Sequence, residues 1–297
     1  MRVSIIIPNF NGKDLLEKNL PSVIKAQENP KNNIFEIIIV DNGSKDESVN
    51  YLNQNFKDKF KLIRNTVNRG FSSAINIGVK SSKGDFILLL NNDVMPEVDF
   101  LESIEEIFAD QKVFGVSLHE KNHGPSRASF QNGIIDIGFT KPESKNKELT
   151  FYVSGAAGIF RKSIWQELGG MDEKLLSPFY WEDIDLCFRA SKRGYTNIWF
   201  PDGHVVHNHE STSSKLPKKY VARIKERNQL LMLWKNIHSK PLMRKHVNAL
   251  SSRLFKSPGY FLILFMALSK LGTVLKLRYK EIKECVVSDE AVFQKYQ

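Results

Sequence analysis

Short apolar runs alternate with amphipathic stretches over the first hundred residues of the chain. The apolar runs predict four buried strands, at Val3–Ile7, Glu36–Val40, Lys61–Arg64 and Phe86–Leu90. The stretches between them have helical spacing and predict helices at Lys13–Gln27, Ser44–Leu52 and Ser72–Lys80. Apolar strands interleaved with helices are typical of a parallel sheet that is covered on both faces. We therefore expect an α/β fold.

Three of these strands end in turns that are rich in Asn and Asp. The turns read PNFN after the first strand, VDNGS after the second and LNND after the fourth. One such residue is best explained as a helix cap or a turn former. Parallel topology, however, brings all three turns to the edge of the sheet where ligands bind. The sequence thus predicts a binding site at that edge.

The second half of the chain has a less regular pattern. Residues 120–150 are polar and predict a loop or a hairpin, and Phe151–Phe160 is strand-like around a kink of small residues. A helix near Ser163–Leu168, a helix from Trp181 to Lys192 and a strand at Tyr195–Phe200 follow. From Leu216 onward the pattern is helical and basic. We expect an α/β domain over residues 1–215 and a helical extension over residues 216–297.

The charge is divided unevenly between these two parts. Residues 1–211 have 25 Lys or Arg against 28 Asp or Glu, and residues 212–297 have 18 against 5, giving net charges of −3 and +13. A basic tail on a mildly acidic domain indicates a docking surface. It lacks the patterns of known nucleic-acid-binding modules, so we expect no nucleic-acid partner. Two cysteines and an N-terminus without a signal-peptide pattern lead us to expect a cytoplasmic protein.

Three groups of residues could carry chemistry. Asp93 ends the fourth strand and could bind Mg²⁺ or Mn²⁺ together with a diphosphate, although a lone Asp there is usually a cap. Glu182, Asp183 and Asp185 open a predicted helix beside three aromatic residues, where a shielded carboxylate could act as a general base; a solvated helix start is the simpler interpretation. The third group consists of His204, His207 and His209, one of which could bind the metal together with Asp93. Their spacing alone does not indicate which one.

Two common nucleotide-binding patterns are missing. No GxGxxG follows the first strand, which argues against a Rossmann dehydrogenase, and no GxxxxGK[ST] loop indicates a P-loop enzyme. A nucleotidyltransferase would carry a Gly-rich basic loop after the first strand, where this chain has PNFNGKD. These classes are therefore disfavoured.

Seven segments in order carry a resemblance to a known family. They read IIIPNFNG, IIVDNGSKD, NRGFSSAINIG, ILLLNNDV, VSGAAGIFRK, YWEDIDLCFRASKRGY and VVHNHESTS. Over residues 1–235 the chain resembles the family 2 inverting glycosyltransferases of the GT-A fold, and among them bacterial rhamnosyltransferase-like members. The resemblance implies a Rossmann-like, mostly parallel sheet with a nucleotide-binding half at about 1–115 and an acceptor half at about 116–215.

The resemblance also implies roles for individual residues. It implies a nucleotide-sugar site formed by Pro8, Asn9, Asn11, Asp41, Ser44, Asn68, Gly70, Phe71, Asn76 and Asn92. Gly155 and Trp181 would shape the pocket for donor and acceptor. Asp183 would be the catalytic base, with Glu182 beside it. Asp93 and His207 would bind Mg²⁺ or Mn²⁺, with His209 as the second choice of histidine. Asn91 stands where the family's DxD element has its first Asp, so the implied metal site has one carboxylate fewer than in the family.

The implied activity is transfer of a sugar from a dTDP- or UDP-linked donor to a glycan or lipid-linked acceptor in cell-envelope polysaccharide synthesis. The alternative is a catalytically weak or inactive member that still binds a sugar nucleotide, an idea supported only by Asn91.

The basic tail contains one apolar stretch. Ser257–Ser269 is 13 residues long, uncharged and flanked by Lys256 and Lys270. About 20 apolar residues are needed to span a bilayer, whereas 10–14 are typical of a core or interfacial helix. We expect a peripheral protein on the anionic inner face of the cell membrane; packing of the tail on the main domain or into a dimer is the alternative.

Overall fold

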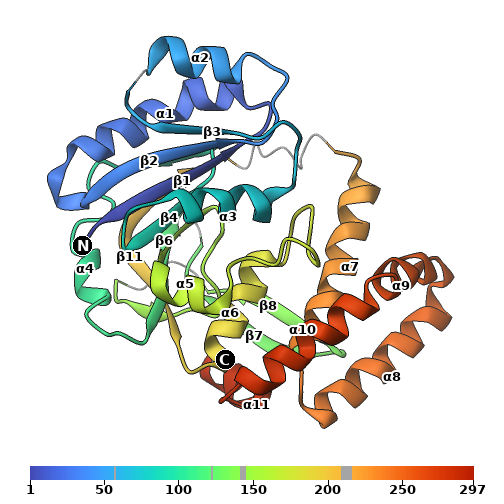
Figure 1. Cartoon of the computed structure of the whole chain (residues 1–297). Helices are drawn as coiled ribbons and strands as arrows, with labels where there is room; N and C mark the ends of the chain where they lie inside the picture. The colour runs from blue at the N-terminus through green and yellow to red at the C-terminus, as the bar shows by residue number, and fades with distance from the viewer. Residues whose placement is uncertain (57, 122, 141–144, 209–215) are drawn as a thin grey trace.

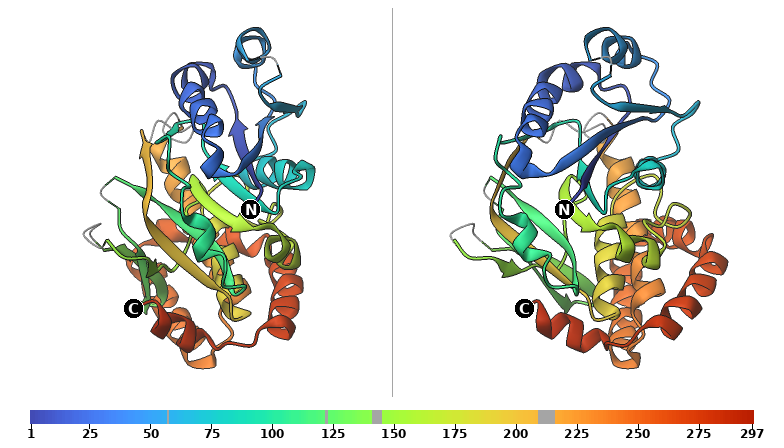
Figure 2. Two further views of the ribbon diagram at one scale, coloured as in Figure 1. Left: turned by 90° about the vertical axis from the view of Figure 1, so that its left-hand side faces the viewer. Right: turned by 60° about the vertical axis from the view of Figure 1, so that its left-hand side comes forward.

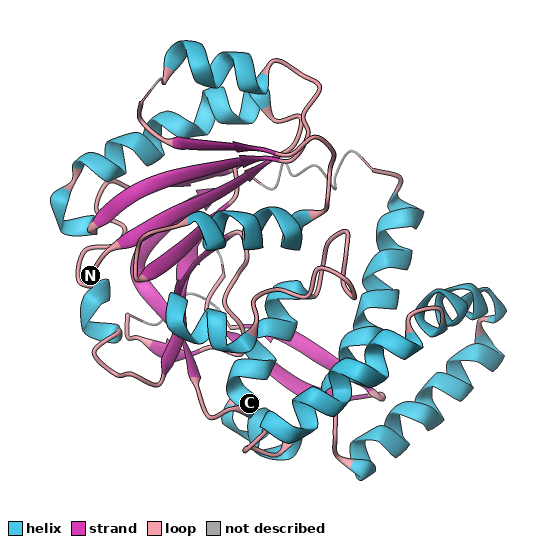
Figure 3. Cartoon of the chain, in the orientation of Figure 1, coloured by secondary structure: helices cyan, strands magenta, loops and turns pink. Residues whose placement is uncertain are grey.

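The computed structural model describes residues 1–56, 58–121, 123–140, 145–208 and 216–297. A twisted mixed sheet forms the centre of this part of the chain, with helices on both faces (Figures 1 and 3). His209, the second choice for a metal-binding histidine, lies outside the described residues.

The sheet is parallel at one end and mixed at the other. The strand order is β3 (Lys61–Arg64), β2 (Ile34–Asp41), β1 (Val3–Asn9), β4 (Phe86–Leu90), β10 (Ala157–Arg161), β6 (Val113–Glu120), β11 (Thr196–His207) and β5 (Val94–Pro96). The first four strands are mutually parallel, and so are β6 and β11. In contrast, β10 runs antiparallel to both of its neighbours, and β5 and the short β9 (Glu148–Leu149) run antiparallel to β11.

The side chains of the central strands point alternately to the two faces of the sheet and belong to two separate hydrophobic cores. Ile5 and Ile7 of β1 face one cluster, which includes side chains of α1 (Lys13–Glu28), α2 (Ser48–Asn55) and α4 (Ile104–Ile107). Ile6 faces the other cluster, formed with α3 (Phe71–Ser81), α5 (Lys162–Leu168) and α6 (Glu182–Lys192). Successive side chains of a strand point to opposite faces, so a run that is apolar throughout must be covered on both sides.

The C-terminal helices lie at the lower right in the view of Figure 1 and form the orange and red part of Figure 2, and α7 and α11 contact α6. They are α7 (Lys218–Asn236), α8 (Lys240–Lys256), α9 (Phe261–Leu268), α10 (Leu271–Glu284) and α11 (Asp289–Lys295). The hairpin of β7 (Ser126–Gln131) and β8 (Ile134–Phe139) joins them in a third core, where Tyr296 is fully buried with Phe151 and Phe188. No single described helix has the length and apolarity to cross a membrane; Pro258–Leu268 and Leu271–Glu284 qualify only as a pair, and they meet at a 64° bend.

The expected α/β fold with a mostly parallel sheet is confirmed, and several details differ. β10 enters the sheet antiparallel, and β5, β6 and α4 were not predicted. The strand expected over Phe151–Phe160 covers only Ala157–Arg161. The second helix begins at Ser48 instead of Ser44, because the Asp46 carboxylate accepts hydrogen bonds from Ser48 N–H and Oγ and turns the chain there. Residues 120–150 were expected to form a loop or a hairpin, and they contain the β7–β8 hairpin.

Candidate active site

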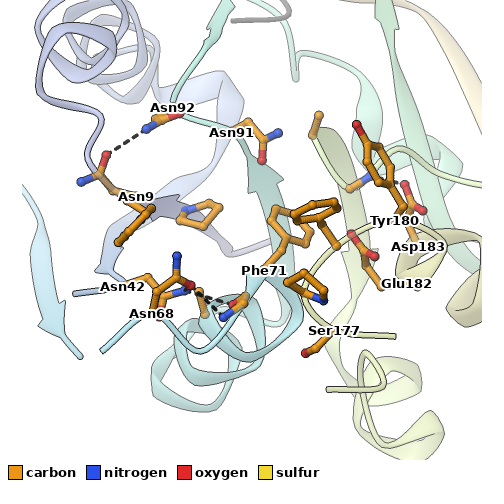
Figure 4. Close-up of a pocket in the computed structure, with 18 of the residues that line it drawn as sticks. Asn9, Asn42, Asn68, Phe71, Asn91, Asn92, Ser177, Tyr180, Glu182 and Asp183 are labelled. Carbon is orange, nitrogen blue, oxygen red and sulfur yellow. Dashed lines mark hydrogen bonds between the residues drawn. The ribbon is translucent and has the colours of Figure 1, made fainter. Parts of the chain in front are cut away.

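A cavity of about 830 Å³ opens at the carboxyl edge of β1, β2 and β4. Its walls come from the turns after these strands, from the start of α3 and from the loop before α6. Figure 4 shows amide side chains, among them Asn9, Asn42 and Asn68, on one side and Glu182 and Asp183 on the other, with Phe71 between them. Of the residues predicted for the site, those that line this cavity are Pro8, Asn9, Asn68, Gly70, Phe71, Asn92, Asp93, Gly155, Glu182, Asp183 and His207.

Paired amides connect the turns of β1 and β4. The Asn92 side chain donates a hydrogen bond to Asn9 Oδ1 at 2.8 Å, and Asn9 Nδ2 donates to Asp41 Oδ2 at 3.1 Å. Gly12 lies against this pair, and a Cβ there would stand 2.3 Å from Asn92 Nδ2. Glycine at position 12 therefore leaves room for the contact between the two turns.

Three of the nucleotide-binding residues predicted in the turns after β1 and β2 lie outside the lining of the cavity. Asp41 is buried and accepts hydrogen bonds from the Asn9 side chain and from Ser44 N–H. Ser44 Oγ accepts from Asn11 N–H at 2.9 Å, and Asn11 Oδ1 accepts from Lys45 N–H at 2.8 Å. These contacts fix the shape of the turns that line the cavity, and direct binding of the nucleotide by Asp41, Ser44 and Asn11 stays a prediction.

Asn42, which sequence reasoning missed, organises the wall formed by residues 65–71. Its side chain donates to Asn68 Oδ1 at 2.9 Å and to Gly70 O at 3.1 Å. Its Oδ1 accepts from Asn65 Nδ2 and from Arg69 N–H. Gly70 has φ +86°, a conformation that favours glycine, and it delivers Phe71 N–H to the carbonyl oxygen of Pro178 at 3.0 Å. The loop before α3 is thereby joined to the loop before α6.

Asp93 and His207 form a buried pair at the floor of the cavity. Asp93 is 1% exposed, and among the described residues neither of its carboxylate oxygens receives a hydrogen bond; His207 Nε2 lies 3.3 Å from Oδ1. His207 Nδ1 lies 3.2 Å from Glu120 Oε2, a contact that the sequence did not indicate. Burial lowers the pKa of His207, but the nearby carboxylates of Asp93 and Glu120 outweigh burial and raise the pKa to about 9.

This pair fits a divalent cation. A buried carboxylate without donors beside an imidazole offers one oxygen and one nitrogen ligand, which Mn²⁺ accepts and Mg²⁺ accepts less readily. In the part of the chain that the structure describes, no group of three or more His, Cys, Asp or Glu could hold an ion by itself. A cation here would complete its coordination with oxygens of a bound diphosphate and water.

Glu182 and Asp183 open α6 on the opposite side of the cavity. Asp183 Oδ2 accepts from Gly155 N–H at 3.1 Å and Oδ1 accepts from Ile184 N–H at 2.8 Å. Burial raises the pKa of Asp183, and these backbone donors oppose the rise. The pKa of Glu182 lies well above its usual value, because the side chain is buried and the charges of Asp183 and Asp185 are close. The pair can therefore hold one proton on Glu182 while Asp183 stays a base.

The remaining predicted residues have structural contacts. Trp181 packs against the third core at a φ of +77° and does not line the cavity. Asn76 donates to Met171 O and Glu173 Oε1, tying α3 to the segment after α5. Asp185, for which a surface position was the simpler interpretation, is fully buried and binds Arg189 and Lys235.

The cavity also has lining residues that sequence reasoning passed over. They include Phe10, Asn42, Arg69, Ser154, Ser177 and Tyr220. Asn42 and Ser154 belong to the quoted segments VDNGS and VSGAAG, so the motifs contained a signal for them. Tyr220 lies in α7, and nothing in the sequence pattern linked that helix to the site.

Comparison with known proteins places the chain among sugar transferases. The family model Glycosyl transferase family 2 matches residues 4–168, which is more than half of the chain. The chain is 27% identical over 216 residues to the pre-mycofactocin glycosyltransferase of Mycobacterium tuberculosis, covering 70% of this chain and 43% of that protein. It is 24% identical over 230 residues to the O-antigen chain rhamnosyltransferase RfbN of Salmonella typhimurium, covering 74% and 70%. The first two curated relatives are matched over only 27% and 43% of their own lengths.

Solved structures share the fold at low sequence identity. GalNAc-T7 with UDP, GalNAc and Mn²⁺ matches 88% of this chain and 57% of that chain at a TM-score of 0.63 and 14% identity. S. aureus TarS 1-349 in complex with UDP-GlcNAc matches 96% and 82% at a TM-score of 0.57 and 16% identity. The chain has the GT-A fold, and the family model matches residues 4–168. The chain therefore belongs to glycosyl transferase family 2.

Proposed function

We propose that the protein transfers a sugar, with inversion at the anomeric carbon, from a nucleotide-diphosphate sugar to an acceptor hydroxyl. The observation that carries the proposal is that Asp183 lines the same cavity as the Asp93–His207 pair. A base for the acceptor and a place for the leaving diphosphate are the two requirements of a single displacement. A pair of carboxylates flanking the bond, as in glycoside hydrolysis, is not needed.

Asp183 is the residue that we assign as the base. Its two backbone hydrogen bonds hold the carboxylate in one orientation, and its raised pKa strengthens it as a proton acceptor. Burial and the nearby charges of Asp183 and Asp185 raise the pKa of Glu182 well above its usual value, which favours its protonated form. Asp183 would take the proton of the acceptor hydroxyl as that oxygen attacks the anomeric carbon and the bond to the diphosphate breaks.

Asp93 and His207 are the residues that would hold Mg²⁺ or Mn²⁺. A bound cation would supply Lewis-acid stabilisation of the charge on the leaving diphosphate. Support comes from the buried Asp93 carboxylate and from two fold relatives whose structures contain Mn²⁺. Asn91 lines the cavity next to this pair and contributes an amide in place of a second carboxylate.

For the donor we propose a dTDP- or UDP-linked sugar held by the amides of Asn9, Asn68 and Asn92 and by Phe71. Amide groups can donate to and accept from a base or ribose, and the Phe71 ring offers an apolar surface. We further propose a glycan or lipid-linked acceptor in cell-envelope polysaccharide synthesis. The similarity to an O-antigen chain rhamnosyltransferase supports that assignment.

The test is a panel of nucleotide sugars incubated with the purified protein, with and without Mn²⁺. Release of nucleoside diphosphate identifies the donor, and NMR of the product reports the anomeric configuration. We expect one preferred donor and an inverted product. Retention of configuration would overturn the proposed mechanism, and tight donor binding with no turnover on any acceptor would favour the inactive sugar-nucleotide-binding alternative.

A further inference from the structure

The two helices α9 and α10 expose apolar side chains to solvent. On α9 the exposed residues are Phe261, Leu262, Phe265 and Leu268, and Phe265 is 64% exposed. On α10 they are Leu271, Leu275, Tyr279 and Ile282, with Leu275 at 56% and Tyr279 at 62%. We call these eight residues the apolar surface. A folded chain gains nothing from exposing so many large apolar groups, so this surface indicates a binding partner.

The apolar surface has the spacing of one face on each helix. On α10 the exposed apolar residues recur at intervals of four, four and three, while Val274 and Glu281 face the protein interior. On α9 the opposite side carries Ala267, which packs against α7 together with Tyr260. Both helices are therefore anchored through one side and present a second apolar side outward.

Lysines stand directly beside this surface. Lys276, Lys280 and Lys283 are exposed, and each follows an apolar residue of the α10 face by one position. The Lys283 ammonium lies over the Tyr279 ring at 4.3 Å. Long lysine side chains at the rim of an apolar face can reach phosphate groups while their methylene stems stay with the apolar groups.

The positive charge of the surrounding segment indicates which kind of partner the apolar surface binds. Residues 227–280 contain eleven Lys or Arg and no Asp or Glu. A dimer through this face would be unfavourable, because a two-fold contact would place the same cationic surfaces against each other. An anionic lipid bilayer is complementary to both the apolar and the basic groups.

We propose that the apolar surface of α9 and α10 docks the protein onto an anionic membrane surface. The helices would lie in the plane of the interface, because α9 is 8 residues long and meets α10 at a 64° bend. The docking surface is fixed relative to the cavity, because α7 packs on both α9 and α10 and its residue Tyr220 lines the cavity. The proposal does not depend on the transfer reaction.

The test measures binding to phosphatidylcholine vesicles with and without phosphatidylglycerol, by co-sedimentation in the absence of nucleotide. Wild-type protein should bind only the anionic vesicles, and less as salt rises. The double variant Phe265→Ser/Leu275→Ser should weaken the partition by about tenfold or more, since two apolar side chains leave the interface. The matched control is Phe35→Ser, which removes a side chain that is 50% exposed in β2 and should change nothing.

A second pair of variants tests the charge. Lys276→Glu/Lys280→Glu should weaken binding by about fivefold for each positive charge removed, whereas Lys25→Glu/Lys80→Glu on α1 and α3 should not. Thermal unfolding of each variant checks that the fold is intact. Equal binding to neutral vesicles, or wild-type binding that resists salt, would overturn the proposal. A dimer in solution that the double serine variant converts to monomer would assign the surface to contact between copies instead.

Discussion

The side chain of Asn228 in α7 donates a hydrogen bond to the carbonyl oxygen of Tyr180 at 2.9 Å, directly before the acidic start of α6. The same amide nitrogen lies 2.9 Å from Phe179 O and 2.5 Å from Leu176 O. Arg227 donates to Asn228 Oδ1 and thereby fixes which end of the amide faces the loop. Tyr180 has a φ of +72° and costs energy in that conformation, so an external contact must hold the loop. Asn228 is such a contact.

Replacing Asn228 with Leu should therefore loosen the loop before Asp183. The change leaves buried carbonyl oxygens without a donor, which costs about 1–3 kcal/mol of unfolding free energy. We expect a lower melting temperature and slower sugar transfer, with the loss in kcat larger than the change in KM. The matched control is Asn248→Leu at an exposed position of α8. An unchanged melting temperature would show that other contacts suffice to hold the loop.

Asp183→Asn should abolish most transfer and leave donor binding nearly unchanged, because the shape stays while the proton acceptor is lost. The expected loss in kcat is about 10²–10⁴-fold. Glu182→Gln should cost less, since the pKa of Glu182 is raised well above its usual value and glutamine resembles the protonated carboxyl group in shape. Steady-state kinetics and calorimetric donor binding measure the two effects. If Asp183→Asn retains wild-type turnover, the base is another group and Glu182 becomes the candidate.

Asp93→Ala should weaken binding of both Mn²⁺ and the nucleoside diphosphate, and His207→Ala should do so more mildly. Asp93 supplies the buried carboxylate, whereas His207, whose pKa is raised, must lose a proton to bind the cation, and water can take its place. Titration calorimetry with Mn²⁺, in the presence of UDP, measures the loss. Asp99→Ala, at an exposed position between β5 and α4, is the control. Full activity in excess chelator would exclude a metal role for this pair.

His246 should make the fold sensitive to acid. Its Nδ1 lies 2.7 Å from Gly133 O and its Nε2 accepts from Trp234 Nε1 at 2.9 Å, so the ring is neutral with the proton on Nδ1. Burial lowers its pKa, and the hydrogen bond with Gly133 O only partly opposes this. His246 therefore binds a proton more readily in the unfolded chain than in the folded chain. The free energy of unfolding falls as the pH drops below 6.5, the pKa of histidine in the unfolded chain.

The cost for one such histidine is at most about 1.4 kcal/mol for each pH unit. Melting temperatures of wild type and His246→Gln, compared between pH 7.5 and 5, measure it. The variant is expected to start lower at pH 7.5 and to lose less on acidification. Parallel curves for the two proteins would show that His246 does not titrate in this range.

Local sequence determined the parallel half of the sheet and the place of the site. β4 is apolar at every position, and β1 and β2 contain the unbroken apolar runs Ile5–Ile7 and Ile37–Val40, which burial on both faces explains. Polar turns at their carboxyl ends then predict a common edge, and Asn9, Asn92 and Asp93 do line one cavity there. Glu182 and Asp183 were found because acidic residues at the start of a helix beside aromatic residues form a local pattern.

Only the tertiary structure decided which of two residues adjacent in the sequence faces the cavity. Asp41 and Asn42 are adjacent, and their side chains point in different directions, so the sequence could not tell that Asn42 lines the cavity while Asp41 supports Asn9 below it. The antiparallel entry of β10 and the presence of β6 depend on pairing between distant segments, which leaves no local signal. Contacts of the same long-range kind bring Glu120 to His207 and Asn228 to Tyr180, and they join residues that are far apart in the sequence.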